Sequence, residues 1–211
     1  MHLASGTLAN QVCTATAAIS AASVVYALSR LRSQATPQRL LRVGMGALVV
    51  FIAQMVDVPL FGSVGVHLIG AAFLTMLAGP VLALLGMATV IVIQAFALND
   101  GGVTTLGANV LNMAVVGVGV SALALHVVRA RVAGTPGILA AAALASVASV
   151  MAAVSTMSIE LALSGTPALD AFGLTMPAHA SFAAWETTGT LVLAMLAVRL
   201  RALDVPVRVV K

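Results

Sequence analysis

Apolar residues fill this chain in long, nearly uninterrupted stretches, and the few charged residues lie mainly between them. A transmembrane helix needs about 20 apolar residues, because every backbone polar group in the hydrocarbon must be paired within the helix. Seven stretches approach or exceed this length and predict helices at roughly 9–29, 40–56, 58–79, 80–98, 104–127, 137–163 and 178–198. The pattern predicts an all-α membrane protein, a seven-transmembrane-helix bundle in a single domain, 1–211.

The third and fourth predicted helices share one apolar stretch of 41 residues, 58–98, so their separation needs an argument. The stretch is twice the length of one crossing, and Gly79-Pro80 is a turn dipeptide near its middle. With a turn there, the arginines fall on one side of the membrane, whereas Asp57, Asp100 and Asp170 fall on the other. Arginine-rich loops remain cytoplasmic, so we expect the N-terminus outside and the C-terminus inside. These arginines are Arg30, Arg32, Arg39, Arg42, Arg129, Arg131, Arg199, Arg201 and Arg208.

Composition narrows the function classes. The chain is 61% hydrophobic and 8% charged, with a mean hydropathy of +1.13, which excludes an ordinary soluble domain. Its formal charge of +4 comes from short arginine clusters without interleaved aromatic residues, so we expect no nucleic-acid partner. Lys211 is the only lysine and no phosphate-binding loop is present, so this chain cannot hydrolyse ATP for transport. Cys13 is the only cysteine, which excludes a thiolate metal site or a disulfide within the chain.

The N-terminus offers an unusual set of nitrogen ligands. No lysine or arginine precedes Arg30, so we expect no cleaved signal peptide and a chain that begins at Met1. The terminal amine, the amide nitrogen of His2 and its imidazole can close two chelate rings on one metal ion. One further imidazole would complete a planar set of four nitrogens, which suits Ni(II) or Cu(II). By itself, however, a Met-His start is a weak signal.

His67 is a candidate for that further imidazole. In a helix it would lie about 18 Å above the turn at Gly79, in the outer half of the membrane. Residues 1–8 can extend ~26 Å at most, enough to reach inward from the outer surface. The alternative is that His67 is a hydrogen-bonded core residue.

Other polar residues inside the predicted spans are candidates because burial in lipid is costly. Thr105, Asn109 and Asn112 share one helix face below Asp100, where they could orient a ligating imidazole or form interhelical hydrogen bonds. His179 and Glu186 also share a face, and we expect them to form a structural pair. The full set is His67, Gln94, Thr105, Asn109, Asn112, His126, Glu160, His179 and Glu186.

Four stretches resemble the substrate-binding membrane subunits of cobalt and nickel energy-coupling-factor transporters, the CbiM/NikM family. They are Met1-His2-Leu3 with Gly6 and Leu8, residues 66–70 with 77–80, residues 100–109 with Asn112-Met113, and residues 160–165 with the spacing of His179 and Glu186. The segment 100–109, Asp-Gly-Gly-Val-Thr-Thr-Leu-Gly-Ala-Asn, is the most specific of the four.

The resemblance implies a seven-helix fold in a bacterial inner membrane and a metal site made of Met1, His2 and His67. Residues 1–8 would form the metal-binding loop, with Asp100, Thr105, Asn109 and Asn112 around the ligands. Ni(II) or Co(II) would be the transported substrate, with no organic cofactor. The implied partners are a transmembrane coupling (T) subunit, cytoplasmic ATP-binding subunits and a small accessory membrane subunit.

Two function classes therefore remain at this point. The first is a metal-uptake subunit that binds Ni(II) or Co(II) outside and depends on partner ATPases. The second is a polytopic membrane enzyme or assembly scaffold, although no His-Glu-x-x-His or Gly-x-Ser-x-Gly motif supports catalysis. Nitrogen ligands accept both metals, so the sequence leaves nickel and cobalt open.

Overall fold

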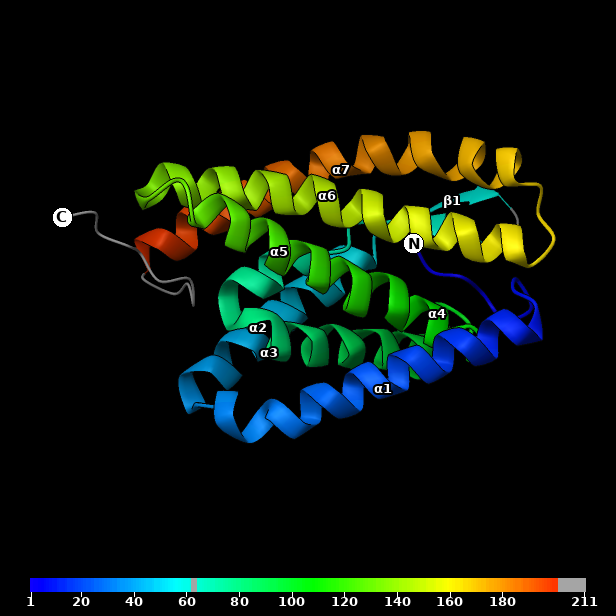
Figure 1. Cartoon of the computed structure of the whole chain (residues 1–211), viewed down its shortest axis with the longest axis horizontal. Helices are drawn as coiled ribbons and strands as arrows, with labels where there is room; N and C mark the ends of the chain where they lie inside the picture. Colours follow the sequence, from blue (N-terminus) through cyan, green and yellow to red (C-terminus); the bar gives the residue numbers. More distant parts are fainter. Residues whose placement is uncertain (62–63, 201–211) are drawn as a thin grey trace.

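The computed structural model describes residues 1–61 and 64–200, most of them helical (Figure 1). The helices are α1 (Asn10–Gln34), α2 (Pro37–Gln54), α3 (Ala71–Ile93), α4 (Leu106–Val110), α5 (Val118–Arg129), α6 (Gly134–Leu163) and α7 (Ala168–Arg199). Two π-helical segments, η1 (Gln94–Leu98) and η2 (Leu111–Gly117), continue α3 and join α4 to α5. Strands β1 (Val58–Phe61) and β2 (Val64–Val66) pair antiparallel. Arg201 and Arg208 lie outside the described residues.

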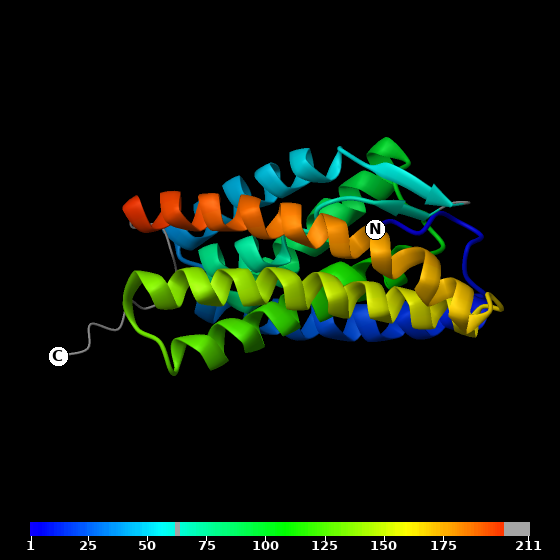
Figure 2. The ribbon, with the colours of Figure 1, turned by 90° about the horizontal axis from the view of Figure 1, so that it is seen from above.

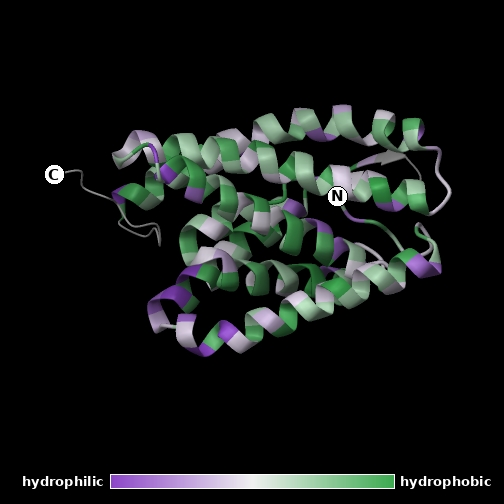
Figure 3. Ribbon diagram, viewed as in Figure 1, coloured by the Kyte–Doolittle hydropathy of each residue, from purple (hydrophilic) through white to green (hydrophobic). Residues whose placement is uncertain are grey.

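Five helical stretches of the described chain are long and apolar enough to cross a membrane. They are Asn10–Gln34, Ala71–Leu98, Leu106–Arg129, Gly134–Leu163 and Ala168–Arg199. Large apolar side chains stay exposed along them, as with Tyr26 and Trp185. Apolar residues cover most of the bundle, and hydrophilic residues gather where α1 meets α2 (Figure 3). The protein is therefore a multi-pass membrane protein whose outer surface suits lipid.

The chain reverses at Gly79-Pro80, inside the stretch assigned to α3. Gly79 has φ 77° and ψ 167°, which interrupts the helix. The side-chain nitrogen of Gln54 lies 2.8 Å from the Ile69 carbonyl oxygen and 3.6 Å from the Met87 sulfur. In a straight helix, residues 69 and 87 would be about 27 Å apart. The turn predicted from the dipeptide is therefore present, and the two halves of α3 lie side by side.

The predicted helix 58–79 is wrong over its first half. Residues 58–61 and 64–66 form β1 and β2, residues 67–70 have no regular secondary structure, and helix begins only at Ala71. Hydrophobic length does not distinguish these structures, because a β-branched apolar run suits a strand as well as a helix. Val64 and Val66 are buried within the bundle, where non-helical backbone is tolerated. His67 consequently lies in a loop and not in a helix.

The helices form an elongated bundle in which α6 and α7 run antiparallel along most of their length (Figures 1 and 2). α1, α5 and α7 all end on the same side of the bundle, and their last turns carry Arg32, Arg129 and Arg199. The β-hairpin and the first turn of α7, with Asp170, lie at the opposite side. The positive charges are thus separated from the acidic end, as the sequence predicts.

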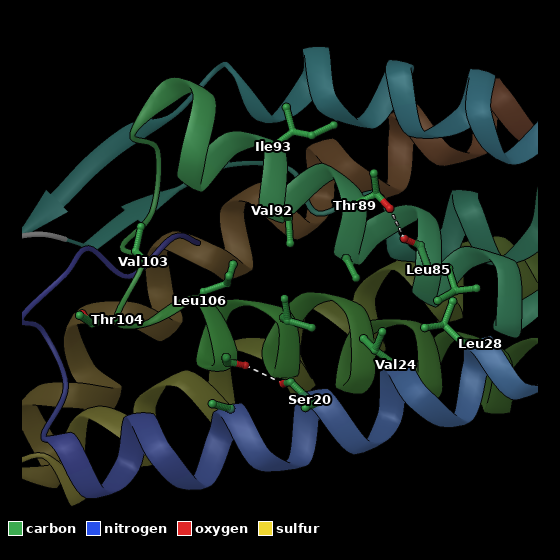
Figure 4. A pocket seen from close by; sticks show the side chains of 15 residues that line it. Ser20, Val24, Leu28, Leu85, Thr89, Val92, Ile93, Val103, Thr104 and Leu106 are labelled. Carbon is green, nitrogen blue, oxygen red and sulfur yellow. Dashed lines mark hydrogen bonds between the residues drawn. The ribbon is translucent and has the colours of Figure 1, made fainter.

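An apolar groove of about 570 Å³ lies between α1, the second half of α3 and α4 (Figure 4). Its side chains include Val24, Leu85 and Val92. On one wall the hydroxyl of Ser20 donates to the Gly107 carbonyl oxygen over 2.7 Å. This bond ties α1 to α4, and α4 in turn positions residues of the candidate site.

Candidate metal site

The N-terminal segment enters the bundle and is held there through the backbone of Leu3. The Leu3 amide donates to Asn109 Oδ1 over 2.9 Å. Its carbonyl oxygen accepts from the Gly102 amide at 2.8 Å, from Asn109 Nδ2 at 3.1 Å and from the Thr105 hydroxyl at 2.5 Å. Leu3 also forms a β-bridge to Val64. These contacts fix the residue that follows His2, so they set where His2 lies.

Two glycines explain the close approach of this segment to the loop before α4. Gly101 has φ +80°, a conformation that side chains rarely adopt. A Cβ atom on Gly102 would collide with the Ser5 nitrogen and the Ala4 carbonyl carbon. The Asp-Gly-Gly motif is therefore required locally by the N-terminal segment that packs across it.

His2 and His67 lie against each other inside the bundle. Their ring centroids are 4.6 Å apart with 30° between the planes. The exposed fractions are 4% for His2, 1% for His67 and 0% for Met1. Residues distant in the sequence thus place a terminal amine and two imidazoles in one buried region.

The loop that carries His67 is held from α7. Glu186 is buried, and its two carboxylate oxygens accept from the amides of Ile69 at 2.5 Å and Gly70 at 2.9 Å. Gly70 has φ +79° at the N-terminus of α3, and a Cβ atom there would collide with Val50. His67 Nδ1 lies 2.7 Å from the Leu68 carbonyl oxygen. Because a carbonyl only accepts, Nδ1 carries the proton and Nε2 keeps a free lone pair.

Burial keeps the nitrogen donors of the site neutral. It lowers the pKa of the Met1 amine to about 4, although the charges of Asp57, Asp100 and Glu186 oppose this shift. Burial also lowers the pKa of His2, and it lowers the pKa of His67 well below 6.5. At neutral pH these groups therefore carry lone pairs rather than protons, as metal ligands must.

Asp100 lies beside this cluster, with Oδ1 3.2 Å from Nδ1 of His2. This contact lowers the pKa of Asp100, so its carboxylate is ionised. Asp57 is exposed and adds a second negative charge that acts on the amine. Two acidic groups therefore place negative potential next to the nitrogen donors.

The three polar residues predicted to share a helix face below Asp100 have two different kinds of hydrogen-bond partner. Thr105 and Asn109 hold Leu3, as described above, and touch no imidazole through a hydrogen bond. Asn112, in η2, instead donates to Glu160 of α6 over 2.8 Å, which is an interhelical hydrogen bond. Thr105 and Asn109 therefore hold the N-terminal segment, whereas Asn112 joins two helices.

The predicted pair between His179 and Glu186 is wrong. His179 Nδ1 lies 2.8 Å from the Thr175 carbonyl oxygen one turn earlier, whereas Glu186 holds the amides before α3. Sharing a helix face places two side chains near each other but does not choose their partners. Gln94 is buried in η1 without a side-chain partner among the described residues, and His126 is exposed in the last turn of α5.

No group of three His, Cys, Asp or Glu side chains within residues 1–61 and 64–200 is arranged to hold a metal ion. Any metal site at His2 and His67 therefore needs backbone nitrogens. Sequence reasoning missed how Glu186 and Leu3 serve this region. The buried charge of Glu186 marked it as important, but its partners are backbone amides, which no residue pattern reveals.

Comparisons with known proteins agree with this architecture. The model of a family described as "Cobalt uptake substrate-specific transmembrane region", CbiM, matches residues 2–202. The cobalt transport protein CbiM of Sorangium cellulosum is 34% identical over 167 residues, covering 77% of this chain and 72% of that protein. The fused nickel transport protein NikMN of Rhodobacter capsulatus is 33% identical over 117 residues, covering 56% of this chain and 34% of that protein.

Among solved structures, a truncated transition metal transporter superimposes with a TM-score of 0.83 at 24% identity, covering 95% of this chain and 98% of that one. This likeness shows a shared fold. The chain spans less than half the length of several curated relatives that it matches. These relatives are named as transport proteins and not as enzymes. Because the family model covers residues 2–202, the chain belongs to the CbiM family of cobalt uptake substrate-specific transmembrane proteins.

Proposed function

We propose that this protein is the substrate-binding subunit of a transporter that imports Ni(II) or Co(II). The ion would be held by the Met1 amine, the amide nitrogen and imidazole of His2, and the imidazole of His67. The observation that carries the proposal is the buried contact between the two imidazoles, next to a buried terminal amine. Four nitrogen donors without a thiolate suit these metals better than Mg(II) or Ca(II).

Metal capture would rearrange His2. The second chelate ring closes through Nδ1 of His2, and this atom faces Asp100 in the structure. Binding would therefore exchange the contact with Asp100 for a metal bond. Asp100 would remain close enough to stabilise the positive charge of the ion, and Thr105 and Asn109 would keep the ligand segment in place through Leu3.

The orientation follows from charge. Arginines at the ends of α1, α5 and α7 support a cytoplasmic location for that side. With the two halves of α3 counted separately, the proposal has seven membrane-embedded helical segments, with the N-terminus outside and the C-terminus inside. The site would then be loaded from the extracytoplasmic side of a bacterial inner membrane.

The partners would supply the energy. This chain has no phosphate-binding loop, so cytoplasmic ATP-binding subunits would hydrolyse ATP and a transmembrane coupling (T) subunit would transmit the change. The fused relatives NikMN and CbiMQ carry further transport modules in one chain. Their names favour a small accessory membrane subunit and a coupling subunit as partners here.

Metal titration of the purified protein tests the proposal. We expect about one Ni(II) or Co(II) per chain, lost in His67→Ala and in a form with extra residues before Met1. His126→Ala is the matched control, because this exposed imidazole lies in the last turn of α5. Stoichiometric binding that survives both changes would refute the site, and competition between the two metals would assign the preference.

A further inference from the structure

The apolar groove between α1, the second half of α3 and α4 has the length of one membrane leaflet. Its wall on α1 runs from Ala17 to Leu28 (Figure 4), which is about 16 Å of helix. The hydrocarbon of one leaflet is about 15 Å thick. Leu28 is followed two residues later by Arg30, the first charged residue of α1. In the proposed orientation the groove therefore lies in the cytoplasmic leaflet.

The wall of the groove suits a hydrocarbon chain better than a polar solute. The hydroxyls of Ser20 and Thr89 donate to backbone carbonyl oxygens of the protein, over 2.7 Å and 2.8 Å (Figure 4). Three large apolar side chains along the groove stay 40–51% exposed: Leu28, Val92 and Val103. In a membrane these surfaces face lipid.

The groove is also narrow. Its volume of about 570 Å³, divided by a length of about 16 Å, gives a mean cross-section of about 36 Å². A helix about 10 Å in diameter has a cross-section of roughly 80 Å². A chain of methylene groups can therefore enter the groove, whereas a whole transmembrane helix cannot.

Positive charge lies at the cytoplasmic end of the groove. Arg32 is one turn after Leu28 and so lies on the groove face of α1. Arg39, in the first turn of α2, donates to the backbone and side-chain oxygens of Gln34 at the end of α1. Residues 1–56 contain four arginines and no Asp or Glu. Such a basic cluster beside a transmembrane helix attracts anionic headgroups.

We propose that the groove binds an acyl chain of an anionic phospholipid, whose headgroup phosphate lies at Arg32 and Arg39. The chain packs against the contact between α1 and α4 that Ser20 makes with Gly107. The lipid therefore supports the part of the bundle that leads to Asn109, which holds Leu3. Lipid binding itself is independent of the proposed function, and only the choice of leaflet depends on the proposed orientation.

The experiment uses native mass spectrometry of the full chain with phosphatidylglycerol or phosphatidylcholine of identical acyl chains. We expect a single phosphatidylglycerol per chain, bound in preference to phosphatidylcholine. Arg32→Gln should weaken phosphatidylglycerol binding about fivefold, the effect of one arginine near an anionic headgroup. Arg30→Gln is the matched control, because Arg30 lies off the groove face with its guanidinium 5.3 Å from the centre of the Tyr26 ring. Its affinity should stay within about twofold.

A second pair of variants tests the groove itself. Ala21→Phe fills the groove and should abolish binding, whereas Ala22→Phe changes a neighbouring exposed residue outside it and should not. Thermal unfolding of all four variants shows that they are folded. Glycerol phosphate, which has the headgroup charge but no chains, should not displace the lipid.

Several results would overturn the lipid site. Equal affinity for the two lipids would exclude the role of the headgroup charge, and equal losses in the two arginine variants would show a diffuse charge effect. Retained lipid in Ala21→Phe, or displacement by glycerol phosphate, would exclude the groove. So would a photoreactive residue at position 21 that cross-links to another polypeptide rather than to lipid in native membranes. None of these results bears on metal binding, so the proposed function stands or fails separately.

Discussion

Replacing Glu186 by glutamine removes the charge from the carboxylate that holds the loop behind His67. Glutamine keeps one carbonyl oxygen and places an NH2 group where the second carboxylate oxygen lay. The amide of either Ile69 or Gly70 then loses its acceptor inside the bundle. An unsatisfied buried donor costs about 1–3 kcal/mol. The ordered form of the loop that positions His67 should be destabilised by that free energy.

The cost converts into metal affinity, because binding requires the loop in its ordered form. With about 1.4 kcal/mol for each factor of ten, the Kd for Ni(II) or Co(II) should rise roughly 5- to 150-fold. The measurement is calorimetric titration of the purified protein in detergent. Thermal unfolding of the same samples reports the accompanying loss of stability.

Glu160→Gln is the matched control. Glu160 is equally buried at 3% exposure, but it accepts from the side-chain amide of Asn112, which can rotate to present its oxygen. We expect little change in metal affinity there. If the Kd of Glu186→Gln for metal lay within about twofold of the Kd of Glu160→Gln, the order of the loop would not depend on the Glu186 carboxylate and the reasoning would be refuted.

Three further predictions concern the N-terminal segment. Gly102→Ala should abolish metal binding, because the added Cβ would collide with Ser5 and Ala4. Gly119 has open space around it, so Gly119→Ala should bind metal normally. Equal metal binding by the two variants would contradict the packing described. Metal binding at pH 7 should release about one proton, from the His2 amide, because the Met1 amine with a pKa of about 4 is already neutral. Calorimetry in buffers of different ionisation enthalpy counts the protons that are released. If the amine had its ordinary pKa of 8.0, about two protons would be released. Without added metal, the free energy of inserting this segment should be constant above pH 8.0 and become less favourable by about 1.4 kcal/mol per pH unit as pH falls toward 4, because the inserted amine has the lower pKa. Hydrogen-exchange protection of the Leu3 amide, corrected for intrinsic rates, should follow this slope. Protection that stays constant over this pH range would contradict the prediction.

The sequence predicted those features that depend on the length of apolar stretches, on the position of charged residues and on the backbone preferences of glycine and proline. Hydrophobic length and arginine position predicted the helical bundle and its charge separation, and Gly79-Pro80 predicted the chain reversal that Gln54 now demonstrates. The nitrogen-rich N-terminus called for one further imidazole from elsewhere in the chain, and the family resemblance implied that it is His67. The rings of His2 and His67 lie in contact, and their role as metal ligands stays a prediction.

The sequence was less informative where partners are backbone groups. Residues 58–66 have the apolarity of a membrane helix, yet β1 and β2 pair as strands, and Val64 and Val66 of β2 are buried inside the bundle. His179 and Glu186 share a helix face, yet each bonds to backbone groups rather than to the other. Such partners depend on the tertiary arrangement, because every residue offers the same amide and carbonyl.

The anchoring of Leu3 has a consequence for assembly. Its amide bonds to a side chain 106 residues later in the chain, and its carbonyl accepts from Gly102 and Thr105. These contacts cannot form before residues 102–109 have been synthesised, and closing so long a loop costs conformational entropy before the contacts stabilise it. The first residues to leave the ribosome therefore reach their final position only once the segment that ends in α4 is available to hold them.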